Sequence, residues 1–180
     1  LLGLEQEDPK PVAMARLISS TAASTRRIAV LSAGSSQGVT AGMPVRSPLG
    51  LVGRVLEVGH STSRILLITD TESIVPVRRA SDGLPAFLQG RADGTVQVKL
   101  INLGINPLRV GDTFVTSGSG GLYRPGIAIG IVAEVLRDGA VVQLLSNPAA
   151  TDYVAVEPVW APEAVAEVAK PVVEPQQQRQ

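Results

Sequence analysis

The chain has no cysteine, one histidine and few aromatic side chains among its 180 residues. Without cysteine it can form no disulfide, no thiolate zinc site and no thiol nucleophile. One histidine excludes a polyhistidine metal site, and we expect neither a metal nor another cofactor. Two Phe, two Tyr and one Trp are too few for the base-stacking surface of a single-stranded nucleic-acid binder. No apolar run reaches the roughly 18 residues that a membrane-spanning helix needs.

What the chain does contain is a pattern of short strands. Apolar residues make up 44% of the sequence and charged residues 18%, which is enough to bury a core. Val96, Val98 and Leu100 alternate with polar residues, as expected of a strand with one buried face. Asp93-Gly94 and similar pairs follow at the spacing of hairpin turns. The pattern predicts an all-β fold.

An internal repeat relates two parts of the chain. Residues 50–70 align with residues 127–147 at a constant offset of 77, which places Gly53 on Gly130 and Asp70 on Asn147. Upstream the offset is 69, and Gly42 falls on Gly111. Downstream it is 79, and Val75 and Val77 fall on Val154 and Val156. We therefore predict two tandem small β-barrels of six strands each, with Gly53 and Gly130 at bends where a side chain would crowd the neighbouring strand.

The ends of the chain differ from its centre. We expect residues 1–11 to be the end of a helix and linker, 12–80 the first barrel, 81–160 the second, and 161–180 a disordered Pro-rich tail in which residues 162–170 could form a short helix. The assignment leaves open whether a terminal strand pairs in the other barrel. Residues 12–80 carry eight Arg against three acids, whereas 81–160 carry five bases against seven acids. This asymmetry suggests head-to-tail contact between molecules, or an acidic partner.

The change of offset from 69 to 77 means that the second repeat has eight extra residues, within the loop 116–126. Loops on rigid β scaffolds are where binding sites concentrate. We predict that Leu122, Tyr123 and Arg124 bind a partner, since Tyr and Arg are enriched at interface hot spots. Gly126, at the end of the loop, is assigned a structural role. The alternative is an ordinary surface turn.

An alternative function is that of a chymotrypsin-like serine protease, active or degenerate. Two barrels with His60, Asp70 and Ser119 in that order contain the residue types of such a triad. The repeat argues against it. His60 aligns with Arg137 beside a hairpin turn, and Asp70 aligns with Asn147 where an Asx side chain would cap a turn. We expect His60 to be exposed and not paired with Ser119.

Several segments are similar, in order and spacing, to the periplasmic part of the rod shape-determining protein MreC family. They are ARLIS (15–19), GVTAGMPV (38–45), GLVGRV (50–55), SRILLITD (63–70), VPV (75–77), GDTFVTSGSGGLYRPGIAIGIVAEV (111–135) and NPAATDYVAV (147–156). The resemblance covers about residues 12–158. Ala128 departs from the proline that is common at this position in the family.

The resemblance implies a non-enzymatic scaffold of the cell-elongation machinery that regulates peptidoglycan synthesis. Such a protein associates with itself, as a dimer or filament, and binds the elongation-specific class B penicillin-binding protein. MreD, MreB and RodA are its other implied associates. The implied location is the periplasmic side of the bacterial inner membrane, held there by an upstream transmembrane helix outside this chain. Residues 1–8 would then be the end of a coiled coil.

Overall fold

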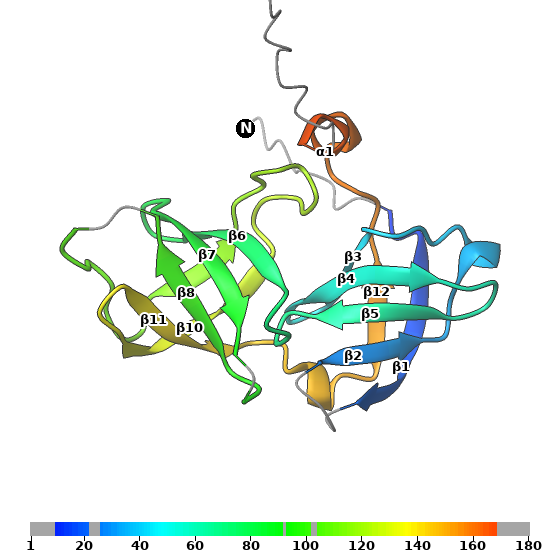
Figure 1. The fold of residues 1–180 in the computed structure, drawn as a ribbon, viewed down its shortest axis with the longest axis horizontal. Coiled ribbons are helices and arrows are strands. Elements are labelled where there is room, and N and C mark those ends of the chain that lie inside the picture. Colours follow the sequence, from blue (N-terminus) through cyan, green and yellow to red (C-terminus); the bar gives the residue numbers. More distant parts are fainter. Residues whose placement is uncertain (1–9, 22–25, 92, 102–103, 169–180) are drawn as a thin grey trace, which may run out of the picture.

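The computed structural model describes residues 10–21, 26–91, 93–101 and 104–168. These residues form two closed antiparallel barrels that lie side by side (Figure 1). The prediction of an all-β fold with two six-stranded barrels is confirmed. Residues 1–9 of the expected helix end and linker (1–11), and residues 169–180 of the expected tail (161–180), lie outside the described residues.

Barrel 1 closes in the order β1-β12-β3-β4-β5-β2. Its strands are β1 (Ala13–Thr21), β2 (Ile28–Leu31), β3 (Pro44–Ser47), β4 (Gly50–Val58), β5 (Ser63–Leu67) and β12 (Tyr153–Val156). Barrel 2 closes in the order β10-β11-β8-β7-β6-β9. Its strands are β6 (Ile74–Arg79), β7 (Pro85–Gly90), β8 (Val96–Leu100), β9 (Thr113–Thr116), β10 (Ala128–Val135) and β11 (Gly139–Leu144). Two 3₁₀ turns, Ser35–Gln37 and Pro148–Ala150, and the helix α1 (Pro162–Val168) complete the described elements.

The last strand of each repeat lies in the other barrel. β6 ends the first repeat but pairs with β7 and β9 in barrel 2, whereas β12 ends the second repeat and pairs with β1 and β3 in barrel 1. The strands of barrel 2 are therefore consecutive in the sequence, whereas barrel 1 is completed by β12, which follows barrel 2 in the chain. The crossover that the sequence left open occurs at both strands, so a division at residue 80 separates the repeats and not the barrels.

This crossover also redistributes charge. Barrel 1 with its connections (12–73 and 145–158) holds six Arg against five acids, and barrel 2 (74–144) holds six Arg and one Lys against five acids. The formal net charges of the barrels are thus +1 and +2. The asymmetry between the halves of the sequence does not exist between the folded barrels, so it gives no support for head-to-tail contact or an acidic partner.

The repeat is confirmed in atomic detail at Gly53 and Gly130. Each pairs with the fifth strand of its repeat, Gly53 with Leu67 and Gly130 with Leu144. A Cβ built on Gly53 would lie 2.2 Å from the Leu66 carbonyl oxygen, and one on Gly130 would lie 2.2 Å from that of Gln143. The backbones approach so closely here that only glycine fits, as the sequence predicted.

Gly42 and Gly111 are equivalent as well. Their φ angles are +90° and +94°, which an L side chain rarely adopts. The Gly42 N–H donates to the Val55 carbonyl at 2.8 Å, and the Gly111 N–H donates to the Val132 carbonyl at 2.9 Å. Because Val55 and Val132 also match at the offset of 77, the same turn closes the same point of each barrel.

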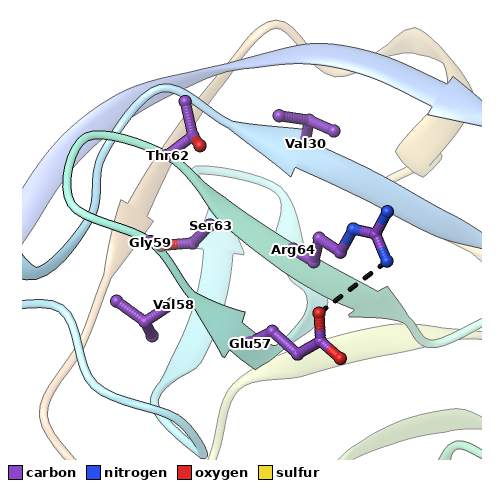
Figure 2. Close-up of a pocket in the computed structure, with 7 residues that line it drawn as sticks. All are labelled: Val30, Glu57, Val58, Gly59, Thr62, Ser63 and Arg64. Atoms are coloured by element: carbon purple, nitrogen blue, oxygen red, sulfur yellow. Dashed lines mark ion pairs between the residues drawn. The ribbon is translucent and has the colours of Figure 1, made fainter.

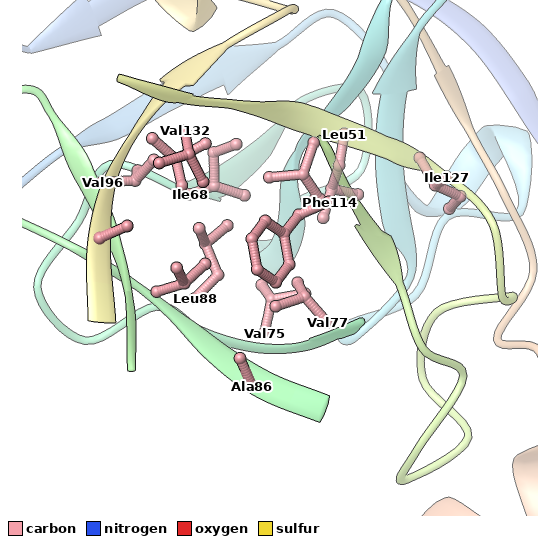
Figure 3. Close-up of a cluster of buried hydrophobic side chains, with 14 of the residues drawn as sticks. Leu51, Ile68, Val75, Val77, Ala86, Leu88, Val96, Phe114, Ile127 and Val132 are labelled. Atoms are coloured by element: carbon pink, nitrogen blue, oxygen red, sulfur yellow. The ribbon is translucent and has the colours of Figure 1, made fainter. Parts of the chain in front are cut away.

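Each barrel has its own apolar core, and one side chain joins them. Barrel 1 is filled by residues such as Leu31, Val45 and Ile65. The core of barrel 2 surrounds Phe114 and includes Leu51, although Leu51 belongs to β4 of barrel 1 (Figure 3). Gly50 beside it leaves room for the Ala128 carbonyl, which a Cβ would approach to 2.4 Å. The barrels therefore pack through shared apolar contact and not through a linker alone.

The segment expected to be a disordered tail begins differently. Residues 162–168 form α1, which lies above the junction of the barrels in Figure 1. The short helix considered for residues 162–170 is present over residues 162–168, and residues 169–180 lie outside the described part of the chain.

Candidate functional site at the barrel junction

The loop between β9 and β10 reaches across from barrel 2 to the exit of barrel 1. The equivalent connection between β3 and β4 has only two residues, 48 and 49, so the eight extra residues form a projecting loop. The loop closes on itself through Thr116, whose hydroxyl donates to the Arg124 carbonyl at 2.7 Å and whose carbonyl accepts from the Gly126 N–H at 2.9 Å. Gly126 has a φ of +89° at this closure.

The three side chains predicted to bind a partner all point into the molecule to some degree. The Tyr123 ring is 3% exposed and packs in the core of barrel 2. Its burial raises the pKa of the phenol to about 12. Leu122 is partly buried against the same core. Tyr123 therefore anchors the loop and contributes no exposed contact area, contrary to the reasoning that singled it out.

Arg124 takes part in an ion cluster that joins the barrels. Glu157, directly after β12, is 1% exposed. Its carboxylate pairs with Arg46 of β3, and Arg124 Nε approaches Glu157 Oε2 to 3.2 Å. A buried carboxylate needs such partners because desolvation of an unpaired charge is costly. The cluster was not predicted, since Arg46, Arg124 and Glu157 are far apart in the sequence.

Backbone hydrogen bonds extend this junction toward α1. The Ala161 N–H donates to the Gly121 carbonyl at 2.7 Å, and the Trp160 N–H donates to the Leu122 carbonyl at 3.3 Å. The hydroxyls of Ser47, at the end of β3, and Ser146, which follows β11, are 2.6 Å apart and buried. The inserted loop thus clasps the segment that leaves barrel 1 and fixes the barrels relative to each other.

The residues of the alternative triad are not assembled. His60 is exposed at the turn between β4 and β5, as predicted. Asp70 is fully buried and accepts from the N–H groups of Arg27 at 2.6 Å and Glu72 at 2.8 Å. Among the described residues, no hydrogen bond joins Ser119 to His60. Asn147 accepts a hydrogen bond from the Ala149 N–H at 3.0 Å, in the same Asx geometry as Asp70 with Glu72. The repeat therefore accounts for the Asp70 carboxylate as a turn cap.

The described surface has shallow hollows. The one in Figure 2, about 300 Å³, lies on barrel 1 beside an exposed ion pair, Glu57 with Arg64 at 3.7 Å. Exposed pairs of this kind contribute little to stability. Within the described ranges, no cluster of three or more His, Cys, Asp or Glu is arranged to hold a metal ion. In the same part of the chain, no helix is long and apolar enough to cross a bilayer.

A second hollow has an apolar lining and was missed by the sequence reasoning. It lies over β1, β12 and β3, and its lining includes Met14, Tyr153 and Ala155. Met14 is 67% exposed and Tyr153 57% exposed, and the Arg16 guanidinium lies 4.9 Å from the Tyr153 ring centroid. The strand alternation places the side chains of these residues on the outer face of the barrel, and this signal could have located the hollow. The alternation alone was not enough, because the sequence does not show that β12 lies next to β1.

One ion pair outside the junction perturbs a titration. Arg79 donates two hydrogen bonds to Asp82, with Nη2 to Oδ2 at 2.6 Å, and also reaches Asp112 at 3.1 Å. The bonds that Asp82 accepts from Arg79, a further bond from the Leu84 N–H, and the Arg79 charge lower the pKa of Asp82 to about 2. Asp82 lies at the turn between β6 and β7, so the pair organises a hairpin and not a catalytic site.

The fold and its junction define the class: a tandem β-barrel protein in which two copies of one barrel are joined by a buried ion cluster and an inserted loop. The chain belongs to the rod shape-determining protein MreC family, whose barrel-core model matches residues 17–168. The family resemblance found in the sequence is confirmed.

Curated relatives agree with this assignment. The cell shape-determining protein MreC of Caulobacter vibrioides is 39% identical over 155 residues, which cover 86% of this chain and 44% of that protein. Its counterpart in Escherichia coli is 37% identical over 110 residues, covering 61% of this chain and 30% of that protein. The chain thus spans less than half the length of these relatives.

Solved structures share the fold. The crystal structure of MreC from Pseudomonas aeruginosa aligns with a TM-score of 0.72 and 27% identity, covering 80% of this chain and 97% of that one. MreC in the complex with the penicillin-binding protein PBP2 from Helicobacter pylori aligns with a TM-score of 0.61, covering 81% and 99%. At 15% identity, the latter similarity shows the fold alone.

Proposed function

We propose that this chain is the barrel core of a non-enzymatic scaffold of the cell-elongation machinery. It acts on the periplasmic side of the bacterial inner membrane. There it binds the elongation-specific class B penicillin-binding protein, associates with itself, and organises and regulates peptidoglycan synthesis. MreD, MreB and RodA are its further associates. The observation that carries the proposal is membership of the MreC family over residues 17–168.

Two further observations support the proposal. An MreC structure with the same fold has been solved in complex with a penicillin-binding protein, and another is of the major periplasmic domain of an MreC filament. The chemistry of this chain is also that of a binding protein. Its buried carboxylates, Asp70 and Glu157, are occupied by structural partners and are not free for proton transfer.

The inserted loop affects binding of the penicillin-binding protein from its position at the barrel junction. Leu122 and Arg124 are partly accessible beside α1, and the buried Tyr123 ring fixes their positions. We place the partner's contact at this side of the molecule, where both barrels, the loop and α1 meet. Loss of a hot-spot side chain costs at least about 2 kcal/mol, or roughly thirtyfold in affinity.

The test is binding of the purified chain to the periplasmic part of the elongation-specific class B penicillin-binding protein, measured by biolayer interferometry. The division-specific class B protein of the same bacterium is the control for specificity. We expect Leu122→Ala and Arg124→Ala to weaken binding, whereas Arg137→Ala, an exposed arginine at the β10–β11 turn, leaves it unchanged. No binding to the elongation-specific protein would refute the proposal. Equal binding by all variants would move the interface away from the loop.

A further inference from the structure

We propose that the β12 position of barrel 1 is a strand-acceptor site, which takes β12 from a second copy of this chain as well as from its own chain. This inference specifies how the self-association proposed above occurs. Barrel 1 has five strands that follow one another, β1 to β5, and a gap between β1 and β3 that only β12 fills (Figure 1). All six strands of barrel 2 are consecutive, so this gap exists only in barrel 1.

The gap binds β12 as a sheet binds an added strand. On one side, Met14 pairs with Ala155 and Arg16 with Tyr153; on the other, Ala155 pairs with Arg46. Val154 and Val156 are 1% and 0% exposed, so both side chains fill the barrel interior. An extended segment therefore gains main-chain hydrogen bonds on both edges and two apolar pockets.

The ion cluster selects which strand is accepted. Glu157 follows β12 and lies against Arg46. At the repeat offset of 79, the residue of β6 that corresponds to Glu157 is Arg78. β6 in the gap would place this arginine near Arg46, and the like charges would repel each other. The gap thus favours β12 over the related strand of the same chain through a repulsive element as well as an attractive one.

The connection to β12 allows exchange between molecules. Residues 145–152 join β11 to β12, and eight extended residues span up to about 26–29 Å. In both the closed and the exchanged form β12 makes the same contacts in the gap, so the balance depends on the connection and on concentration. Barrel 2 of one molecule would then be tied to barrel 1 of the next, giving a head-to-tail assembly.

The absence of cysteine makes a direct test available. Met14→Cys and Ala155→Cys are made in separate 180-residue chains, which are unfolded together in denaturant, refolded as a mixture and oxidised. A disulfide between positions 14 and 155 then requires β12 of one molecule beside β1 of another, and peptide mass mapping identifies it. Arg16→Cys with Tyr153→Cys is the second pair, at two exposed positions, should the first perturb folding. Met14→Cys mixed with Thr113→Cys, also exposed, measures random collision.

At about 1 mM protein, near the effective concentration of a short linker, about half of the gaps would hold an exchanged strand, and half of those strands come from the other variant. We therefore expect the 14–155 disulfide in about a quarter of the chains at that concentration, and roughly fiftyfold less at about 10 μM. Heterodisulfide at the level of the Thr113 control would overturn the inference. If sedimentation still shows association in that case, self-association stands and uses another surface. If it shows none, the self-association proposed above falls as well.

Discussion

Addition of a single methyl group at Gly53 tests the repeat and the barrel closure together. The Cβ of Gly53→Ala would lie 2.2 Å from the Leu66 carbonyl oxygen, and that of Gly130→Ala would lie 2.7 Å from Val142 Cγ1 as well as 2.2 Å from the Gln143 oxygen. Each obstructing oxygen belongs to the backbone of a paired strand, so it cannot rotate away. The strands must separate by roughly 1 Å to restore ordinary contact.

The expected cost lies at the upper end of the range for overpacking, about 3 kcal/mol. For a urea dependence of about 2 kcal/mol/M, the unfolding midpoint falls by roughly 1.5 M. Both variants should show this, because the two sites have the same geometry. The measurement is equilibrium unfolding in urea followed by circular dichroism.

Two other glycines distinguish the cost of the steric contact from the cost of the positive φ angle. Gly104→Ala meets nothing within 4 Å, and we expect a change within about 0.5 kcal/mol. Gly111→Ala also has open space but a φ of +94°, and should cost about 1–2 kcal/mol from the angle alone. A Gly53→Ala protein as stable as Gly104→Ala would refute the reasoning, because the close approach would then not exist in solution.

Three further predictions concern buried and candidate catalytic groups. The folded state raises the pKa of Tyr123 to about 12 from an ordinary value of 10.0, so stability present below pH 10 is lost as pH rises from 10 to 12. The loss should be about 2–3 kcal/mol by urea unfolding, and absent in Tyr123→Phe. Asp70→Ala should lower the free energy of unfolding by about 3 kcal/mol in the same assay, because Asp70 is buried with several donors. Asn147→Ala should lower it by about 1 kcal/mol, because Asn147 caps one exposed N–H. Equal losses would contradict this account. A fluorophosphonate probe should leave Ser119 unlabelled, and labelling that Ser119→Ala abolishes would restore the protease hypothesis.

The assignment of function depended on the sequence more than on any single site. The segments shared with the MreC family run through nearly the whole barrel region and hold their order. The candidate partner residues were harder to choose, because the sequence singles out Tyr123 by its residue type alone and does not show that its ring is buried. Whether a tyrosine in a Gly-rich loop faces solvent or a core depends on how the loop folds back. Here the loop closes on Thr116 and is held by backbone hydrogen bonds from Trp160 and Ala161, contacts that only the tertiary structure shows.

The sequence by itself determined the local features that repeat along the chain. Alternation with a period of two assigned strand faces, and the offset of 77 identified Gly53 with Gly130 and Asp70 with Asn147, because equivalent backbone geometry demands the same residue types. Only the tertiary structure decided which barrel each last strand joins. β6 and β12 have similar apolar patterns, so either would satisfy the inner face of either barrel. The choice depends on connection lengths and on the meeting of Glu157 with Arg46 and Arg124, three residues that are neighbours only after both barrels have closed.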